Sequence, residues 1–150
     1  MSRIFDTLGR LQTSADAQST PTDFSYDVVG NLQTVTDPLL RVTDNDYDAL
    51  GRLKQAITNT AGGSSDKATE QFTYDARDNL RAVIDPKGLA TSYGYDSAGN
   101  LTDLLSPDTG STIYSYDAAG NRVGEMQADN VSQGYAYDAL DRLVTQTFAH

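Results

Sequence analysis

The sequence contains no cysteine and no tryptophan, and its only histidine is the last residue, His150. Without cysteine the chain forms no disulfide and offers no thiolate as a nucleophile or zinc ligand. Without an internal histidine it lacks the most common general base and the Ser-His-Asp triad. We therefore expect a protein that is not an enzyme, with no catalytic residue, no metal site and no cofactor.

Basic residues and long apolar segments are scarce as well. Lys and Arg number 11 against 21 Asp and Glu, which gives a net charge of −10. Because phosphate contacts need Lys and Arg, this balance argues against a nucleic-acid partner. No apolar run approaches the length of a membrane span, and the N-terminus has no apolar core of a signal peptide. With 38% hydrophobic residues, we also expect only a thin core.

A seven-fold repeat is the dominant pattern of the sequence. Each copy is an aromatic residue, an Asp, two variable residues and then Gly or Asp. The copies begin at residues 5, 26, 47, 74, 95, 116 and 137, so the spacing is 21 residues except for one of 27. The residues of this structural repeat motif are Phe5, Asp6, Gly9, Tyr26, Asp27, Gly30, Tyr47, Asp48, Gly51, Tyr74, Asp75, Tyr95, Asp96, Gly99, Tyr116, Asp117, Gly120, Tyr137 and Asp138.

The motif has the composition of a tight turn. An Asp at the first position accepts the N–H two residues on, and a Gly three residues later tolerates a positive φ. This combination is typical of a type I turn followed by a G1 bulge. Two copies carry Asp78 and Asp141 where the others have Gly, and we expect slight strain there because Asp adopts positive φ less readily than Gly.

Short alternating runs flank every turn. The run Thr91-Ser92-Tyr93-Gly94-Tyr95 places Thr and Tyr on one face and small residues on the other. Further turn signals, such as Asp37-Pro38, Asp85-Pro86 and Pro107-Asp108, lie midway between the motifs. Each unit is therefore predicted to be a β-hairpin, giving roughly fourteen strands in an all-β, curled, mostly antiparallel open sheet. Its tyrosines would form an aromatic stripe across the hairpins.

The whole chain, residues 1–150, is predicted to be a single array of such repeats. The one long spacing contains the segment AGGSS, and we interpret residues of about 59–70 as a loop insertion.

The repeated pattern YDxxGNL…DPxGxxTxYxYD resembles the YD repeat of the Rhs family. This family includes Rhs polymorphic toxins, shell components of Tc toxins and animal teneurins. The resemblance implies that the chain forms an arc of a hollow β-cage, which in a longer parent protein encloses a toxin domain. It also implies an extracellular or cell-surface location. The partners it implies are further repeats or copies of the chain itself, paired through open sheet edges.

Several apparent sites have plainer interpretations. The run Asp44-Asn45-Asp46-Tyr47-Asp48 is similar to a calcium loop, but Ala49 stands where Gly is needed and Gln55 where the bidentate Glu belongs. We interpret it as an acidic strand face, and Asp85-Pro86-Lys87-Gly88-Leu89 as an ordinary repeat turn, although it is similar to the start of the family's autoprotease segment. Arg122 replaces the Leu of the other units, and the sequence offers no reason for it.

Two functions remain beside that of a structural wall. The tyrosine stripe offers flat apolar faces that suit a glycan, which would make the chain a cell-surface adhesin or glycan-binding module. Neither end of the chain shows a cap, and bare strand edges favour further pairing. Three interpretations of these ends are open: a piece of a longer protein, a short orphan gene, or a subunit that stacks end to end. The last would make the chain a self-assembling β filament, which is the second alternative function.

Overall fold

The computed structural model describes residues 2–16, 20–59 and 67–149, and these residues contain β-strands and turns but no helix. Fourteen antiparallel strands are hydrogen-bonded in chain order, with no crossover. This confirms the predicted all-β hairpin array. By its internal contacts the chain divides into two compact units, Met1–Phe72 and Thr73–His150, which are described separately. The sequence also predicts a curled sheet and a single domain. Both depend on how the two units are placed relative to each other, so both stay predictions.

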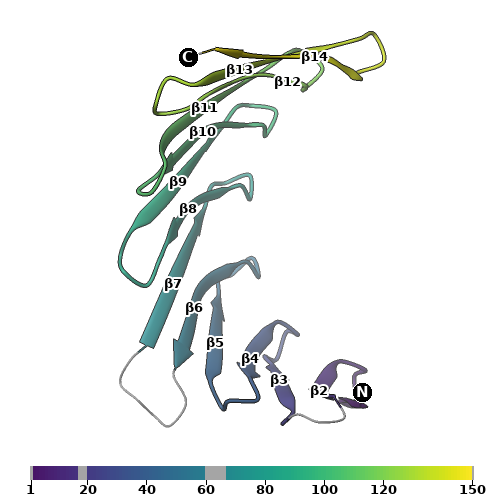
Figure 1. Cartoon of the computed structure of the whole chain (residues 1–150). Coiled ribbons are helices and arrows are strands. Elements are labelled where there is room, and N and C mark those ends of the chain that lie inside the picture. Colours follow the sequence, from purple (N-terminus) through teal and green to yellow (C-terminus); the bar gives the residue numbers. More distant parts are fainter. Residues whose placement is uncertain (1, 17–19, 60–66, 150) are drawn as a thin grey trace. The chain divides into compact units, whose positions relative to one another are not determined.

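The first unit contains three complete hairpins. Its strands are β1 (Ser2–Phe5), β2 (Leu11–Ala15), β3 (Thr22–Tyr26), β4 (Leu32–Thr36), β5 (Val42–Tyr47), β6 (Leu53–Asn59) and most of β7 (Lys67–Tyr74). Figure 1 shows these strands in sequence order within the unit. The part of the predicted insertion at residues 60–66 lies outside the described residues. The rest of it belongs to strands, because β6 ends at Asn59 and β7 begins at Lys67.

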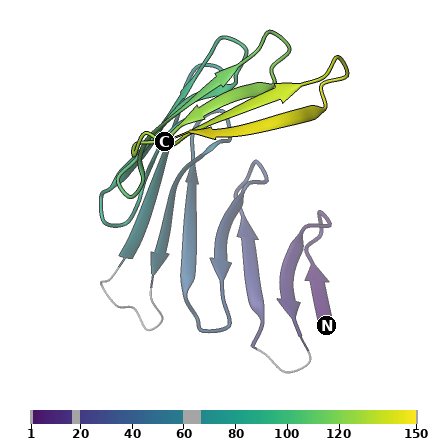
Figure 2. The same cartoon turned by 45° about the horizontal axis from the view of Figure 1, so that its top comes forward.

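The second unit repeats the pattern. Figure 2 shows that its turns alternate between the two ends of the strands. The end of β7 is followed by β8 (Leu80–Ile84), β9 (Ala90–Tyr95), β10 (Leu101–Ser106), β11 (Gly110–Tyr116), β12 (Arg122–Met126), β13 (Ser132–Tyr137) and β14 (Leu143–Ala149).

Neither unit encloses a hydrophobic core. Among the described residues only Thr112 is buried, and no hydrophobic side chain is. The sheet is a single layer, so its apolar side chains are at best half-buried, and many, such as Leu8 and Val28, are exposed. The thin core expected from the composition is confirmed. Stability must therefore come from backbone pairing, turn geometry and contacts between adjacent hairpins, which is typical of repeat architectures.

Candidate functional site: repeated aspartate turns

All seven predicted motifs form the same turn. In each, the residue at the Gly position donates its N–H to the Asp carbonyl three residues before, at 3.0–3.3 Å. The Asp N–H donates in turn to the carbonyl of the residue four positions after the Asp. The residue at the Gly position has a positive φ in every copy, from 57° at Asp141 to 100° at Gly30. The strand register shifts at the motif in β3–β4 and in β11–β12. The hydrogen bond, the positive φ and the register shift are those expected of a type I turn with a G1 bulge.

The Asp carboxylate is the anchor of each turn. Its Oδ1 accepts the backbone N–H groups two and four residues on, at 2.8–3.1 Å in all seven copies. Its Oδ2 accepts a side-chain donor from the residue four positions on, at 2.7–3.1 Å. The sequence indicated the contact to the second residue, but it did not reveal the two contacts to the fourth.

Two different side chains supply the Oδ2 contact. Asn31, Asn79, Asn100 and Asn121 donate through Nδ2, whereas Arg10, Arg52 and Arg142 donate through Nε. Both groups bring an N–H to within 2.7–3.1 Å of Oδ2, so either side chain can fill this role. A signal in the sequence was the restriction of this position to Asn or Arg in every copy.

These contacts lower the pKa of the carboxyl groups. The side chain and the backbone N–H of Asn100 hold the pKa of Asp96 below its usual value. For Asp6 the backbone N–H of Arg10 is the largest cause of the lowered pKa, and partial burial opposes it. The pKa is also lowered at Asp27, Asp37, Asp48, Asp75, Asp117 and Asp138. The structure thus favours charged carboxylates that act as acceptors.

The turn between β4 and β5 has the same geometry, although its Asp-Pro signal suggested only a generic turn. Asp37 accepts the N–H groups of Leu39 and Arg41 through Oδ1, and the Nε of Arg41 through Oδ2. Leu40 occupies the Gly position with a φ of 60°. Asn130, in the turn between β12 and β13, has a φ of 66°. The sequence did not reveal either positive φ value, because neither residue is a glycine.

The segment that begins at Asp85 is an ordinary repeat turn in its geometry. Asp85 Oδ1 accepts the N–H groups of Lys87 and Leu89, each at 2.8 Å. The N–H of Gly88 is bonded to the Asp85 carbonyl at 2.9 Å. These are the contacts of the seven motif turns, without the Oδ2 contact, since Leu89 has no side-chain donor.

Three of the motif tyrosines tie their hairpin to the one before it. The hydroxyl groups of Tyr26, Tyr47 and Tyr137 donate to the carbonyl oxygens of Leu11, Leu32 and Arg122, each at 2.9 Å and each 15 residues back in the chain. The sequence predicted a packing stripe, but it did not reveal this hydrogen bond. We call the three contacts the tyrosine ladder. Because the acceptor is a backbone atom, the ladder does not depend on the side chain that carries it.

The structure supplies a reason for Arg122. Its guanidinium lies 4.8 Å from the ring centre of Tyr135 and 5.6 Å from that of Tyr114, on the two neighbouring strands. It also donates to the Tyr135 hydroxyl at 3.2 Å and pairs with Glu125 at 3.1 Å. Cation–π contacts and an ion pair thus replace the apolar packing of Leu at this position.

The carboxylates of the acidic run that begins at Asp44 have different partners. Asp46 pairs with Lys54 at 2.8 Å, whereas Asp48 anchors a turn and pairs with Arg52 at 2.6 Å. Across residues 2–16, 20–59 and 67–149, no three His, Asp or Glu side chains come together in a way that would hold a metal ion. None of these residues lies in a helix that could cross a bilayer.

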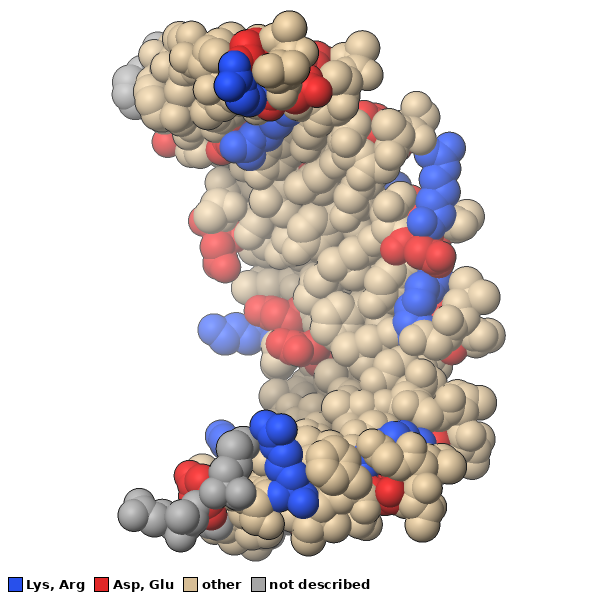
Figure 3. Space-filling view, turned by 90° about the vertical axis from the view of Figure 1, so that its right-hand side faces the viewer, with Lys and Arg blue, Asp and Glu red and all other residues tan. Residues whose placement is uncertain are grey.

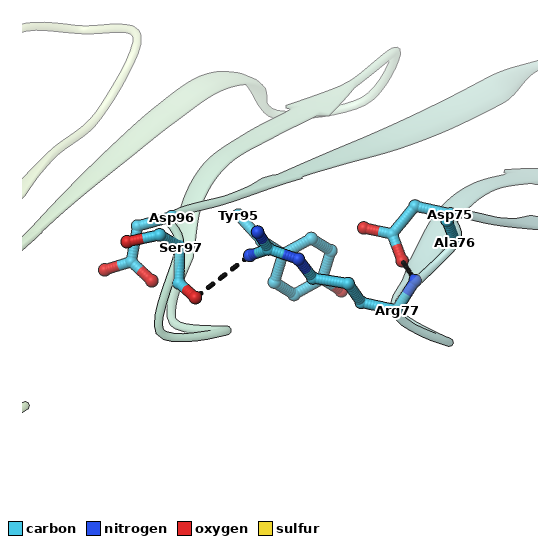
Figure 4. A pocket seen from close by; sticks show the side chains of 6 residues that line it. All are labelled: Asp75, Ala76, Arg77, Tyr95, Asp96 and Ser97. Carbon is cyan, nitrogen blue, oxygen red and sulfur yellow. Dashed lines mark hydrogen bonds between the residues drawn. The ribbon is translucent and has the colours of Figure 1, made fainter.

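A shallow hollow lies between two adjacent turns of the second unit. It has a volume of about 400 Å³ and is lined by Asp75, Ala76, Arg77, Tyr95, Asp96 and Ser97. Figure 4 shows Arg77 extending from one turn to the next, where it donates to the Ser97 carbonyl at 2.9 Å. Figure 3 shows that charged side chains gather mainly along the margins of the face in view, with uncharged residues between them.

Comparison with known proteins decides the family. The family profile described as RHS Repeat matches residues 5–42, 74–111 and 116–149, which together make up more than half of the chain. The chain belongs to the RHS repeat family. The Rhs resemblance predicted from the motif spacing is thereby confirmed. No curated protein sequence matches the chain significantly.

Solved structures share the fold of this RHS repeat chain. The crystal structure of TcdB2-TccC3 matches 99% of this chain with a TM-score of 0.73 and 19% identity, over 9% of its own length. TcdB2-TccC3 without its hypervariable C-terminal region matches 97% of this chain with a TM-score of 0.61 and 18% identity, over 10% of its own length. The chain thus spans about a tenth of the solved chains that it matches.

Proposed function

We propose that the chain is a structural, non-enzymatic segment of a shell wall, in which hairpins pair edge to edge with neighbouring RHS repeats. The observation that carries the proposal is the match of fourteen uncrossed antiparallel strands to TcdB2-TccC3 over 99% of this chain. The turns support it, because the motif carboxylates are engaged in holding backbone N–H groups and so serve the fold.

The wall proposal extends to a cargo. In a longer parent protein, the repeats would enclose a toxin domain, as the Rhs family resemblance implies. The lack of any buried hydrophobic side chain among the described residues supports this role, because a single-layer sheet presents a wide surface on each face.

Edge pairing is tested by joining two and three copies of the chain in tandem. If hairpins pair across the junction, each added copy gains an interface, so the denaturation midpoint rises with copy number. The matched control replaces Val144 or Thr145 in β14 of the upstream copy by Pro, because a proline has no backbone N–H to donate to the neighbouring strand. Midpoints that stay constant with copy number, with or without the proline, would contradict the proposal.

The absence of catalysis is tested separately. We expect no hydrolase, nuclease or protease activity, and no self-cleavage at the Asp85–Pro86 bond during storage at neutral pH. Mass spectrometry of the stored chain checks the second point. Cleavage there that is abolished by replacing an Asp elsewhere in the chain would reveal an autoprotease.

The two alternative functions stay predictions. A glycan-binding module would give signals on a glycan array that fall when Tyr93 or Tyr114 is replaced by Ala. An end-to-end filament would give light scattering that grows with protein concentration and with salt, because screening weakens the repulsion of a chain with net charge −10.

A further inference from the structure

The outermost strand of the second unit, β14, repeats the residues that β2 uses to hold its neighbour (Figure 1). The segment that starts at Asp6 and leads into β2 reads DTLGRLQT, and the segment that starts at Asp138 and leads into β14 reads DALDRLVT. In the sheet order β2 lies between β1 and β3, whereas β14 is paired only with β13 among the described strands. The β2 edge therefore shows how an edge of this composition is covered.

Three side-chain contacts join the β2 edge to β3. The Arg10 guanidinium lies over the Tyr26 ring, 4.4 Å from its centre, and the Tyr26 hydroxyl donates to the Leu11 carbonyl at 2.9 Å. The Thr13 hydroxyl donates to Asp23 Oδ1 at 2.8 Å, and these two residues are directly opposed in the antiparallel pair. The β2 edge thus recognises an Asp and a Tyr that lie three residues apart on one strand.

The same three groups are uncovered on β14. Arg142, like Arg10, donates through Nε to the Asp of its own turn, but its side chain is 72% exposed against 30% for Arg10. Leu143 and Thr145 are exposed, whereas their counterparts in β2 are half-buried. A strand that lies on β14 as β3 lies on β2 would cover all three groups.

The first strand of a second copy of this chain matches that edge poorly. In the register that β3 has on β2, Phe5 and Ser2 take the places of the Tyr and the Asp. Phe5 has no hydroxyl to donate to the Leu143 carbonyl, and Ser2 has no carboxylate to accept from Thr145. Backbone pairing is possible with such a strand, but two of the three side-chain contacts are not.

We propose that β14 pairs with the next RHS repeat of a longer parent chain, and that the first strand of this repeat carries an Asp and a Tyr three residues apart. Arg142 lies over the ring of that Tyr, the Leu143 carbonyl accepts its hydroxyl, and Thr145 donates to the Asp. The proposal rests on the proposed edge-to-edge pairing and adds the residues that select the partner. When a strand adds to a sheet edge, main-chain hydrogen bonds supply affinity and side-chain contacts supply specificity.

The test extends the whole chain after His150 by a copy of residues 19–36, which contain β3, its turn and β4. The appended Tyr then lies 15 residues after Leu143, and the appended Asp lies 10 residues after Thr145, as in the contacts between β2 and β3. We expect the urea midpoint to rise above that of the chain without the extension. We also expect the backbone amides of β14 to exchange with solvent more slowly.

A matched extension carries Tyr26→Phe and Asp23→Ser in the appended copy, which reproduces the residues of β1. It keeps the length, the turn and the backbone donors, so any difference reports the two side-chain contacts. We expect it to lose the larger part of the rise in midpoint, because each substitution removes one hydrogen bond across the new strand pair.

The reciprocal variant is Arg142→Asn/Thr145→Val in the chain itself. Asn fills the same position in four of the motif turns, so the turn is retained. Without the extension, this variant should leave the midpoint nearly unchanged, because both side chains are exposed. With the extension, it should lower the midpoint clearly.

Three results would overturn the proposal. The first is a matched extension that raises the midpoint and protects β14 as well as the original extension does, and it would leave edge pairing intact. The second is an equal effect of Arg142→Asn/Thr145→Val with and without the extension, because the two residues would then act within their own hairpin. The third is no change of midpoint or exchange with either extension, and in that case edge pairing itself would fail as well.

Discussion

The hairpin β3–β4 and the hairpin β11–β12 have the same strand pairing, but the side chains that line them differ. In the first unit, Leu32 follows the turn, and Phe24 is paired with Val35 across the strands. In the second unit, Arg122 takes the place of Leu32, and Glu125 is paired with Tyr114. An apolar lining is thus replaced by an ion pair between two tyrosines.

The features that the two regions share are hydrogen bonds to backbone atoms. Asp27 and Asp117 hold the same two N–H groups. Tyr47 and Tyr137 donate to the carbonyl oxygens of Leu32 and Arg122 at the same distance. Because neither contact depends on the side chain at the acceptor position, the lining of the sheet can vary while the hairpin is retained. The comparison teaches that the aspartate turn defines the repeat, and that the tyrosine ladder at Tyr26, Tyr47 and Tyr137 supports it without regard to the acceptor side chain.

The largest effect is expected from removing the guanidinium. Arg122→Leu restores the residue of the other hairpins, but it leaves Glu125, whose side chain is 13% exposed, without its cation. We expect a loss of about 1–3 kcal/mol in the free energy of unfolding, since a mostly buried charge loses its partner. Urea denaturation measures this loss.

The double variant Arg122→Leu/Glu125→Val sharpens that comparison, because it copies the pair Leu32 and Val35. Replacing a charged pair by packed apolar residues is often neutral or stabilising, so we expect the double variant to regain most of the loss. Strictly additive effects of the two substitutions would show that the ion pair does not couple them.

The shared turn should respond equally in both regions. Gly30 and Gly120 have φ values of 100° and 87°, and a Cβ added there meets nothing closer than 4.0 Å. Gly30→Val and Gly120→Val should each cost more than about 1 kcal/mol from backbone strain alone, because a β-branched residue resists positive φ. Denaturant midpoints that differ widely between the two variants would show that the turns are not equivalent.

The tyrosine ladder should give a smaller effect. Tyr47→Phe and Tyr137→Phe each remove one hydroxyl donor, and we expect each to cost about 0.5–1.5 kcal/mol. The two losses should agree, because both acceptors are carbonyl oxygens although one residue is Leu and the other Arg. Thermal unfolding of the two variants side by side provides the measurement.

A gain in stability is expected where a residue with a positive φ that is not glycine is replaced by glycine. Leu40→Gly and Asp78→Gly should be neutral or stabilise the chain by a few tenths up to about 1 kcal/mol, because they relieve the strain of φ values of 60° and 68°. If calorimetry showed a clear loss of stability in Leu40→Gly, contacts of the Leu40 side chain would outweigh the strain.

Acid should weaken the turns of both regions. The pKa of Asp27 and of Asp117 is lowered in the folded chain. Their contribution to stability is therefore present above the unfolded value of about 3.9, and it is lost as the pH falls through the folded value. We expect the melting temperature to decrease when the pH is lowered below about 4. Asp117→Asn should reduce this dependence, which melting curves between pH 2 and pH 7 would show.

The sequence was sufficient for the features that repeat. Hairpins, strand number and the positive φ at Gly99 follow from local turn chemistry and from the 21-residue period, which a single chain displays seven times. The contacts between hairpins were harder to predict. The bond from Tyr47 to the Leu32 carbonyl and the position of Arg122 between two rings depend on the register of neighbouring strands, which turn signals alone do not determine.

Cross-strand Hα–Hα contacts between consecutive hairpins, measured by NMR on the isolated chain, test the account most directly. Directly opposed residues of antiparallel strands bring their Cα atoms within about 4.5–5.5 Å. The account predicts inter-hairpin pairs such as Thr13 with Asp23 and Gly124 with Gly134, together with the pairs inside each hairpin. Contacts confined to single hairpins, or helix in more than about a fifth of the residues, would contradict it.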